Sequence, residues 1–299
     1  MRRAFLQLHI AILLAGFTGI LGRLITLNEG LLVWYRMLFT VLGLLALGGL
    51  RGRTARASSP AAARGLLGTG AVIALHWVTF YGSIKYANVS VALVCLSSMC
   101  FFTAVLEPWL LRRPPVAVEG LLGILVMAGI ALIFRFDASY RTGIVLGVVS
   151  SMLAALFTVL NKRWLDRESH ETVNLYEMAG GWLSLTLLLP AYSALFPPDH
   201  WLPTPSDFLW LLFLSLVCTV LAIRLSLMAL REVSPFTVNL SYNLEPVYGI
   251  LLAFLVYRED RHLGPGFYAG MSVIVVSVGL QSGRVWLARR RRKAPTAAG

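Results

Sequence analysis

Ionisable side chains inside apolar segments are the residues of this sequence best placed to do chemistry. Glu245 lies beside Pro246 in the middle of one apolar run, and Arg36 and Glu177 lie within two others. A charge in such surroundings costs about 3 kcal/mol or more unless it faces a partner or water. A carboxylate placed there can hold a proton, a cation or an amine, and an arginine can bind a carboxylate through two hydrogen bonds.

Glu245 is the strongest of these candidates. Pro246 removes a backbone donor and frees the carbonyl of Tyr242, and Asn243 adds a further polar group to the same stretch. An interrupted helix in the middle of a membrane is where binding sites form. The alternative is that Glu245 only bonds neighbouring helices and that Pro246 only bends the chain.

Arg36, with Tyr35 beside it, is a candidate for a substrate carboxylate, and Glu177 for a substrate amine. Snorkelling to the interface and an interhelical ion pair, for Glu177 with Arg224, are the alternatives. Arg23 lies close enough to one surface that we expect it to snorkel.

His76, Trp77 and Tyr81 form an aromatic group near the middle of another apolar run. An imidazole can relay protons, and aromatic rings can line an apolar pocket. Ordinary packing is the competing interpretation of the rings. Asn161 is expected to be a helix-end residue.

Membrane-spanning helices must position these residues. The 299 residues are 58% hydrophobic and 13% charged, whereas a soluble domain carries roughly 25% charged residues. The apolar residues come in blocks of about 20 without strand-like alternation, which favours helices over a barrel and makes a soluble fold untenable. The predicted spans are Phe5 to Leu24, Leu31 to Leu50, Gly65 to Ile84, Val89 to Leu111, Val116 to Phe134, Gly143 to Asn161, Thr172 to Leu195, Phe208 to Leu230, Pro235 to Val256 and Pro265 to Trp286.

Lys and Arg residues predict the orientation of these spans. Placing the N-terminus in the cytoplasm puts most of the 26 on that side. The opposite side then holds only Lys85, Arg135, Arg141, Arg258 and Arg261. We therefore expect both termini to be cytoplasmic. The same distribution in short loops argues against nucleic acid as a partner, despite the net charge of +12.

An internal repeat relates the two halves of the chain. Phe17-Thr18 matches Phe157-Thr158, Tyr35-Arg36-Met37 matches Tyr176-Glu177-Met178, and Val89-Ser90 matches Val233-Ser234. Because five helices is an odd number, two such halves must have opposite orientations, an architecture typical of secondary transporters. The predicted organisation is an all-α membrane protein with inverted five-helix repeats over residues 1–140 and 141–288, and a basic tail over 289–299.

Particular motifs carry a resemblance to a known family. They are Trp34-Tyr35-Arg36, the Tyr86-Ala87-Asn88-Val89-Ser90 turn, and Leu244-Glu245-Pro246 followed by Leu251-Leu252-Ala253-Phe254 and Glu259. With these features nearly the whole chain resembles EamA-type members of the drug/metabolite transporter superfamily. The resemblance implies ten helices arranged five plus five, and export as the direction of transport. Glu107-Pro108 departs from the pattern because it lies late in its span, so we do not expect Glu107 to be equivalent to Glu245.

The predicted function is transport of a small organic metabolite, an amino acid or a related amphipathic solute, across a bacterial inner membrane. The chain has no motif for a hydrolase, a metal site or a phosphate loop, and Cys95, Cys100 and Cys218 stand apart, so no enzyme activity, metal or cofactor is expected. A membrane scaffold or lipid-handling protein is the alternative. Proton coupling, for which Glu245 is the first candidate, and a homodimer through the Gly266 and Gly270 face remain open.

Overall fold

The computed structural model describes residues 2–50, 55–136, 138–242, 244–261 and 263–293, and these residues form helices joined by short connections. The elements are α1 (Arg2–Leu24), α2 (Glu29–Leu50), α3 (Pro60–Tyr86), α4 (Val89–Leu96), α5 (Met99–Leu111), α6 (Ala117–Phe136), η1 (Ala138–Tyr140), α7 (Arg141–Leu165), α8 (His170–Leu195), α9 (Pro205–Ser215), the π-helix η2 (Leu216–Leu221), α10 (Ala222–Glu232), α11 (Pro235–Tyr242), α12 (Leu244–Tyr257), η3 (Glu259–Arg261) and α13 (Pro265–Lys293).

Hydrophobic length identifies the membrane-crossing parts. In the described chain, 8 helical segments are long and apolar enough to cross a membrane. Two shorter apolar stretches, Ala117–Ile133 in α6 and Pro265–Ser277 in α13, correspond to the two remaining predicted spans. The predicted ten-helix fold, made of two inverted five-helix repeats, is confirmed.

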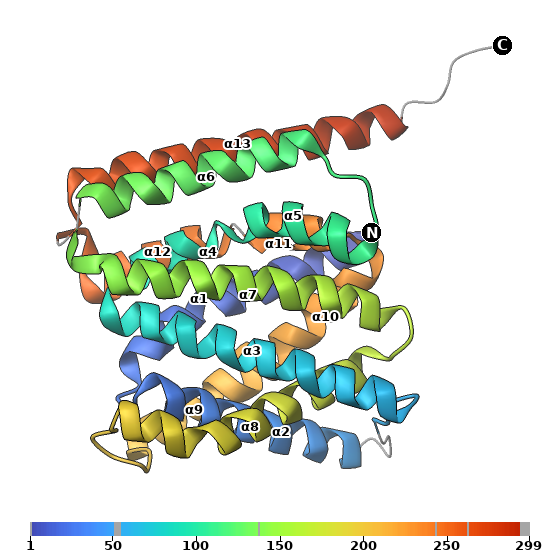
Figure 1. The fold of residues 1–299 in the computed structure, drawn as a ribbon, viewed down its shortest axis with the longest axis vertical. Helices are drawn as coiled ribbons and strands as arrows, with labels where there is room; N and C mark the ends of the chain where they lie inside the picture. The colour runs from blue at the N-terminus through green and yellow to red at the C-terminus, as the bar shows by residue number, and fades with distance from the viewer. Residues whose placement is uncertain (1, 51–54, 137, 243, 262, 294–299) are drawn as a thin grey trace.

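The helices are arranged in layers (Figure 1). α6 and α13 lie side by side as one outer layer, and α2, α8 and α9 lie at the opposite edge. Between them α3 packs against both α7 and α8, so the two halves interleave. The start of α1 and the last turns of α13 lie at the same end of the bundle, which we call the N-terminal end. The other end carries the α1–α2 and α8–α9 connections and is called the far end.

Glycines allow two of the closest helix contacts. A Cβ atom on Gly70 of α3 would collide with the backbone oxygen of Glu177 in α8. A Cβ atom on Gly270 of α13 would collide with the backbone oxygen of Gly129 in α6. Small residues let backbones approach in this way. Gly270 therefore packs against α6 of the same chain.

Two predicted spans are less regular than expected. The fourth is interrupted at Ser97 and Ser98, where the Ser98 hydroxyl lies 2.7 Å from the carbonyl oxygen of Cys95 and 2.5 Å from the hydroxyl of Ser151. The eighth contains η2, in which the Thr219 hydroxyl donates to the carbonyl of Leu214 at 2.7 Å. Hydroxyl groups that bond the backbone commonly distort membrane helices.

The repeats cap each other's helices. Glu259, just after α12 in the second half, accepts hydrogen bonds from the backbone N–H groups of Val89 and Ser90 at the start of α4. Glu107 of α5, in the first half, accepts from the N–H of Phe236 at the start of α11. Each carboxylate thus stabilises the positive end of a helix of the other repeat.

The remaining donors at these two helix starts are satisfied locally. The Asn88 side chain accepts from the N–H of Val91, and the Ser234 hydroxyl accepts from the N–H of Thr237. Glu107 therefore has the same function as Glu259, not that of Glu245. This agrees with the prediction that Glu107 and Glu245 are not equivalent.

Candidate functional site

A central cavity of about 140 Å³ lies between the two repeats. Its polar walls come from both halves and its remaining surface is apolar. Of the predicted site residues, it is lined by Arg36, His76, Trp77, Glu177, Tyr242 and Glu245. The repeat-related residues Thr18, Phe157 and Thr158 line it too. The tertiary structure therefore brings together side chains that lie far apart in the sequence, such as Arg36 and Glu245, which are separated by 209 positions.

Arg36 is the most constrained of the lining residues. Its Nε donates to the Thr219 hydroxyl at 2.9 Å and its Nη1 donates to the Tyr81 hydroxyl at 2.7 Å. The centre of the guanidinium lies 3.7 Å from the centroid of the Trp77 ring. Nη2 takes part in none of the hydrogen bonds found among the described residues. One edge of the Arg36 guanidinium is therefore fixed, and the other edge can bind a ligand.

Thr219 is a site residue that the sequence analysis missed. It lies in η2, whose wider turn accompanies the Thr219 hydroxyl bond to Leu214. π-Helical turns are rare and occur frequently at functional sites. A threonine in an apolar run carries no sequence signal of this role, because its position depends on the local change of helix type.

His76 is oriented by the neighbouring helix α7. Its Nδ1 lies 2.8 Å from the carbonyl oxygen of Ser150, and the Ser150 hydroxyl donates to the His76 carbonyl at 3.0 Å. The carbonyl contact assigns the hydrogen to Nδ1 and leaves Nε2 as an acceptor. The rings of Phe80 and Phe157 lie beside the imidazole, with centroids 6.3 and 5.3 Å away. These rings give the cavity an apolar side.

Glu177 and Glu245 are the carboxylates of the cavity. Glu177 accepts a hydrogen bond from the Asn161 side chain at 3.3 Å, and both residues are buried. Glu245 is 6% exposed and interacts electrostatically with Arg36. In the described structure neither carboxylate has an ion pair within 4.0 Å. Both are available to a cationic group.

Some expectations for individual residues are wrong. Arg224 does not pair with Glu177, because it faces a different cavity. Asn161 does not end its helix, since α7 continues to Leu165. Arg23 does not only snorkel: its Nη1 lies 2.5 Å from Glu259, and its guanidinium stacks on the ring of Tyr257.

Two predicted site residues lie away from the cavity wall. Tyr81 is fully buried behind Arg36 and holds it through the hydroxyl. The Tyr35 hydroxyl donates to the carbonyl of Trp201 at 3.2 Å, at the far end of the bundle. Asn243 lies outside the described residues. Neighbouring positions on a helix face different directions, which explains why Tyr35 does not accompany Arg36.

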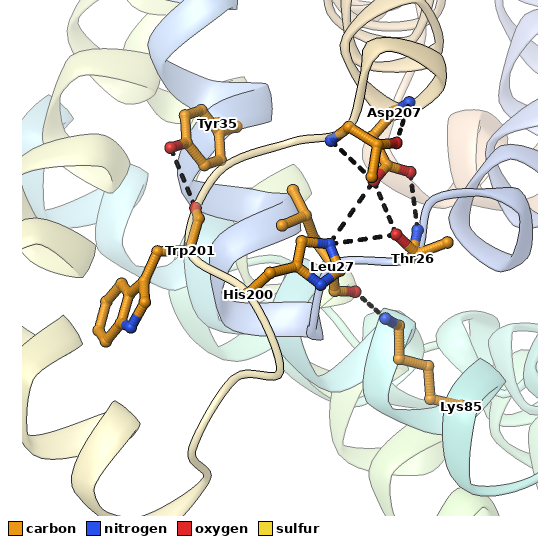
Figure 2. A network of polar contacts seen from close by, with 8 residues as sticks. Thr26, Leu27, Tyr35, Lys85, His200, Trp201 and Asp207 are labelled. Carbon is orange, nitrogen blue, oxygen red and sulfur yellow. Dashed lines mark hydrogen bonds and ion pairs between the residues drawn. The ribbon is translucent and has the colours of Figure 1, made fainter.

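The far end is cross-linked by a polar network between the halves (Figure 2). Asp207 of α9 accepts from the backbone N–H of Thr26 at 2.8 Å and from its hydroxyl at 2.7 Å. His200 Nε2 lies 3.2 Å from the same hydroxyl. Within the first half, Lys85 of α3 donates to the carbonyl of Leu27. The cavity, in contrast, extends toward the N-terminal end, where Leu230 and Val238 line it.

A ten-helix bundle with inverted halves around a buried cavity that contains charged and aromatic side chains is an architecture typical of membrane transport proteins. The chain belongs to the EamA-like transporter family, whose profile matches residues 2–135 and again residues 141–282. This confirms the resemblance stated from the motifs.

Individual similar proteins agree with this assignment. An uncharacterized transporter of Archaeoglobus fulgidus is 27% identical over 221 residues, which cover 70% of this chain and 73% of that protein. A protein of known crystal structure has the same fold, with a TM-score of 0.67 and 19% identity over 97% of this chain and 99% of the other.

Proposed function

We propose that this protein is a secondary transporter of a small zwitterionic, amphipathic metabolite of the amino-acid class. The observation that carries the proposal is the central cavity, which contains one edge of the Arg36 guanidinium, aromatic rings, and two carboxylates that have no ion pair within 4.0 Å among the described residues. A carboxylate, an amine and an apolar side chain are the complementary groups of such a solute.

Each part of the solute has a proposed contact. The carboxylate binds the Arg36 edge that Thr219 and Tyr81 leave open. The amine binds Glu245, which lies in the same cavity. The apolar part packs against Phe80 and Phe157. Glu245 is also the first candidate for a coupling proton, because one carboxylate can exchange an amine for a proton.

Transport proceeds by alternating access between the repeats, with export as the direction. The cavity reaches toward the N-terminal end, while the Thr26–Asp207 contacts hold the far end together. The distribution of Lys and Arg residues supports a cytoplasmic N-terminal end in a bacterial inner membrane. A solute would then enter from the cytoplasm, and breaking the Thr26–Asp207 contacts would open the far end.

The test is counterflow into proteoliposomes preloaded with a mixed pool of amino acids and small metabolites. The wild-type protein is compared with Glu245→Gln and Arg36→Ala, and with Arg163→Gln as a control at an exposed position outside the cavity. We expect exchange of at least one solute, lost in both cavity variants and kept in the control.

Absence of exchange for every solute, with protein that is folded and inserted, would overturn the proposal. A scaffold or lipid-handling protein would then be the better interpretation. Equal exchange by the wild type and both cavity variants would instead show that the substrate does not bind in the central cavity.

A further inference from the structure

A second cavity, of about 1010 Å³, lies at the N-terminal end between α2, α8 and α10. Its size is at the upper end of the roughly 300 to 1,000 Å³ found for small-molecule sites. It is distinct from the central cavity, because α8 presents Asn174 to the second cavity and Glu177 to the central cavity. α10 separates the two cavities in the same way: Arg224 lines the second cavity, and Ser226 lines the central cavity. We call the second cavity the inner groove.

One wall of the inner groove is continuous with the lipid-facing surface. Leu44, Leu45 and Leu47 of α2 form this wall, in the last turns of a membrane-crossing helix. Leu45 is 53% exposed and Leu47 is 39% exposed. Side chains of this kind on a membrane helix contact acyl chains. A ligand in the inner groove can therefore extend a hydrocarbon chain into the bilayer.

The opposite wall is charged. Arg56 and Arg224 line it, and within the described structure neither has an ion pair within 4.0 Å. Of the carboxylates of the groove, Glu168 accepts from the backbone N–H of Ser58. Glu171, in the first turn of α8, lies 3.0 Å from His170 and interacts electrostatically with Arg224. Arg56 and the outer edge of Arg224 are the groups of the groove that can bind an anion.

We propose that the inner groove binds the phosphate headgroup of an anionic phospholipid such as phosphatidylglycerol. Arg56 and Arg224 bind the phosphate, and an acyl chain follows the leucine wall of α2. The leucine wall favours a lipid over a free phosphate ester, which has no apolar part to place there. The site does not depend on the substrate proposed for the central cavity.

The test is native mass spectrometry of the full-length protein titrated with phosphatidylglycerol or with phosphatidylcholine of the same acyl chains. The variants are Arg56→Gln/Arg224→Gln and, as a control, Arg163→Gln, an exposed arginine of the same end that does not line the groove. We expect phosphatidylglycerol to bind about tenfold more tightly than phosphatidylcholine, because phosphatidylcholine carries the same phosphate but adds a quaternary ammonium group that the two arginines repel. The double variant should lose this preference. The control Arg163→Gln should leave the preference for phosphatidylglycerol unchanged.

Retention of the preference by the double variant would overturn the proposal. If the double variant does not fold, Arg56→Gln alone tests the same contact at an exposed position, and full retention there would also count against it. Competition with sn-glycerol 3-phosphate and with inorganic phosphate tests whether the ligand of the groove is a lipid or a soluble phosphate. Displacement of the lipid by either compound at equal concentration would show that a soluble phosphate, not a lipid, is the ligand.

Discussion

The buried carboxylates of this protein fall into two groups, at the rims of the bundle and in its central cavity. At the rims, Glu107 and Glu259 accept hydrogen bonds from helix N-termini and also contact arginines. In the cavity, Glu177 has an asparagine as its described partner, and Glu245 has none within ion-pair distance in the described structure. Burial alone does not distinguish the groups, since Glu259 is 2% exposed and Glu245 is 6% exposed.

The difference teaches that the partners of a buried charge, rather than its depth, indicate its role. A carboxylate surrounded by N–H groups stabilises the fold, because its removal leaves those donors unpaired. A carboxylate that faces a cavity contributes little to folding and is available for binding. Substitution of a rim carboxylate should therefore destabilise the protein, whereas substitution of a cavity carboxylate should leave its stability nearly unchanged.

The largest effect should come from Glu259→Ala. The substitution leaves the N–H groups of Val89 and Ser90 without their acceptor and removes the partner of Arg23. We expect a loss of about 3 kcal/mol in the free energy of unfolding, because two buried N–H groups lose their acceptor, whereas Arg23, whose side chain is 42% exposed, can return to water. Denaturation of the purified protein in mixed micelles measures it, with Glu259→Gln as the matched control that keeps an acceptor. A loss below 1 kcal/mol would contradict the capping role.

Glu107→Ala should have a smaller effect of the same kind. Glu107 caps a single backbone donor, that of Phe236, and the side chain of its ion-pair partner Arg113 is 51% exposed. Arg113 can therefore return to water, and we expect a loss of about 2 kcal/mol. The same denaturation assay gives the value. An effect larger than that of Glu259→Ala would reverse the order predicted from the contacts.

Thr219→Val should reduce transport while the protein stays folded. The hydroxyl positions the Arg36 guanidinium, and valine keeps the shape of the side chain but not the acceptor. We expect about a tenfold lower exchange rate, equivalent to about 1.4 kcal/mol. Thr219→Ser keeps the hydroxyl and should restore most of the rate. Equal rates in the valine and serine variants would show that Thr219 does not act through this hydrogen bond.

The smallest effect on stability should come from the cavity variants Glu177→Gln and Glu245→Gln. Neither carboxylate accepts a backbone N–H bond in the described structure, and glutamine keeps the shape of the side chain, so we expect changes within about 1 kcal/mol of the wild type. The denaturation assay used for Glu259 tests this directly. Destabilisation of 2 kcal/mol or more in either variant would erase the distinction between the rim and the cavity.

The sequence by itself determined the class of fold, the inverted repeat and the charged residues Arg36, Glu177 and Glu245 that line the cavity. Apolar length and the cost of a buried charge are local properties, so Arg36, Glu177 and Glu245 could be selected without coordinates. The repeat also predicted that Arg36 and Glu177 occupy matching positions, and both line the cavity.

Only the tertiary structure decided which helices each polar group meets. Tyr35 and Tyr81 turn away from the cavity, Glu259 rather than the bilayer surface receives Arg23, and η2 brings Thr219 to Arg36. Hydrophobicity fixes how deep a residue lies in the membrane. It does not fix the rotation of a helix about its axis or the identity of the neighbour across the interface, because both follow from packing between segments far apart in the chain.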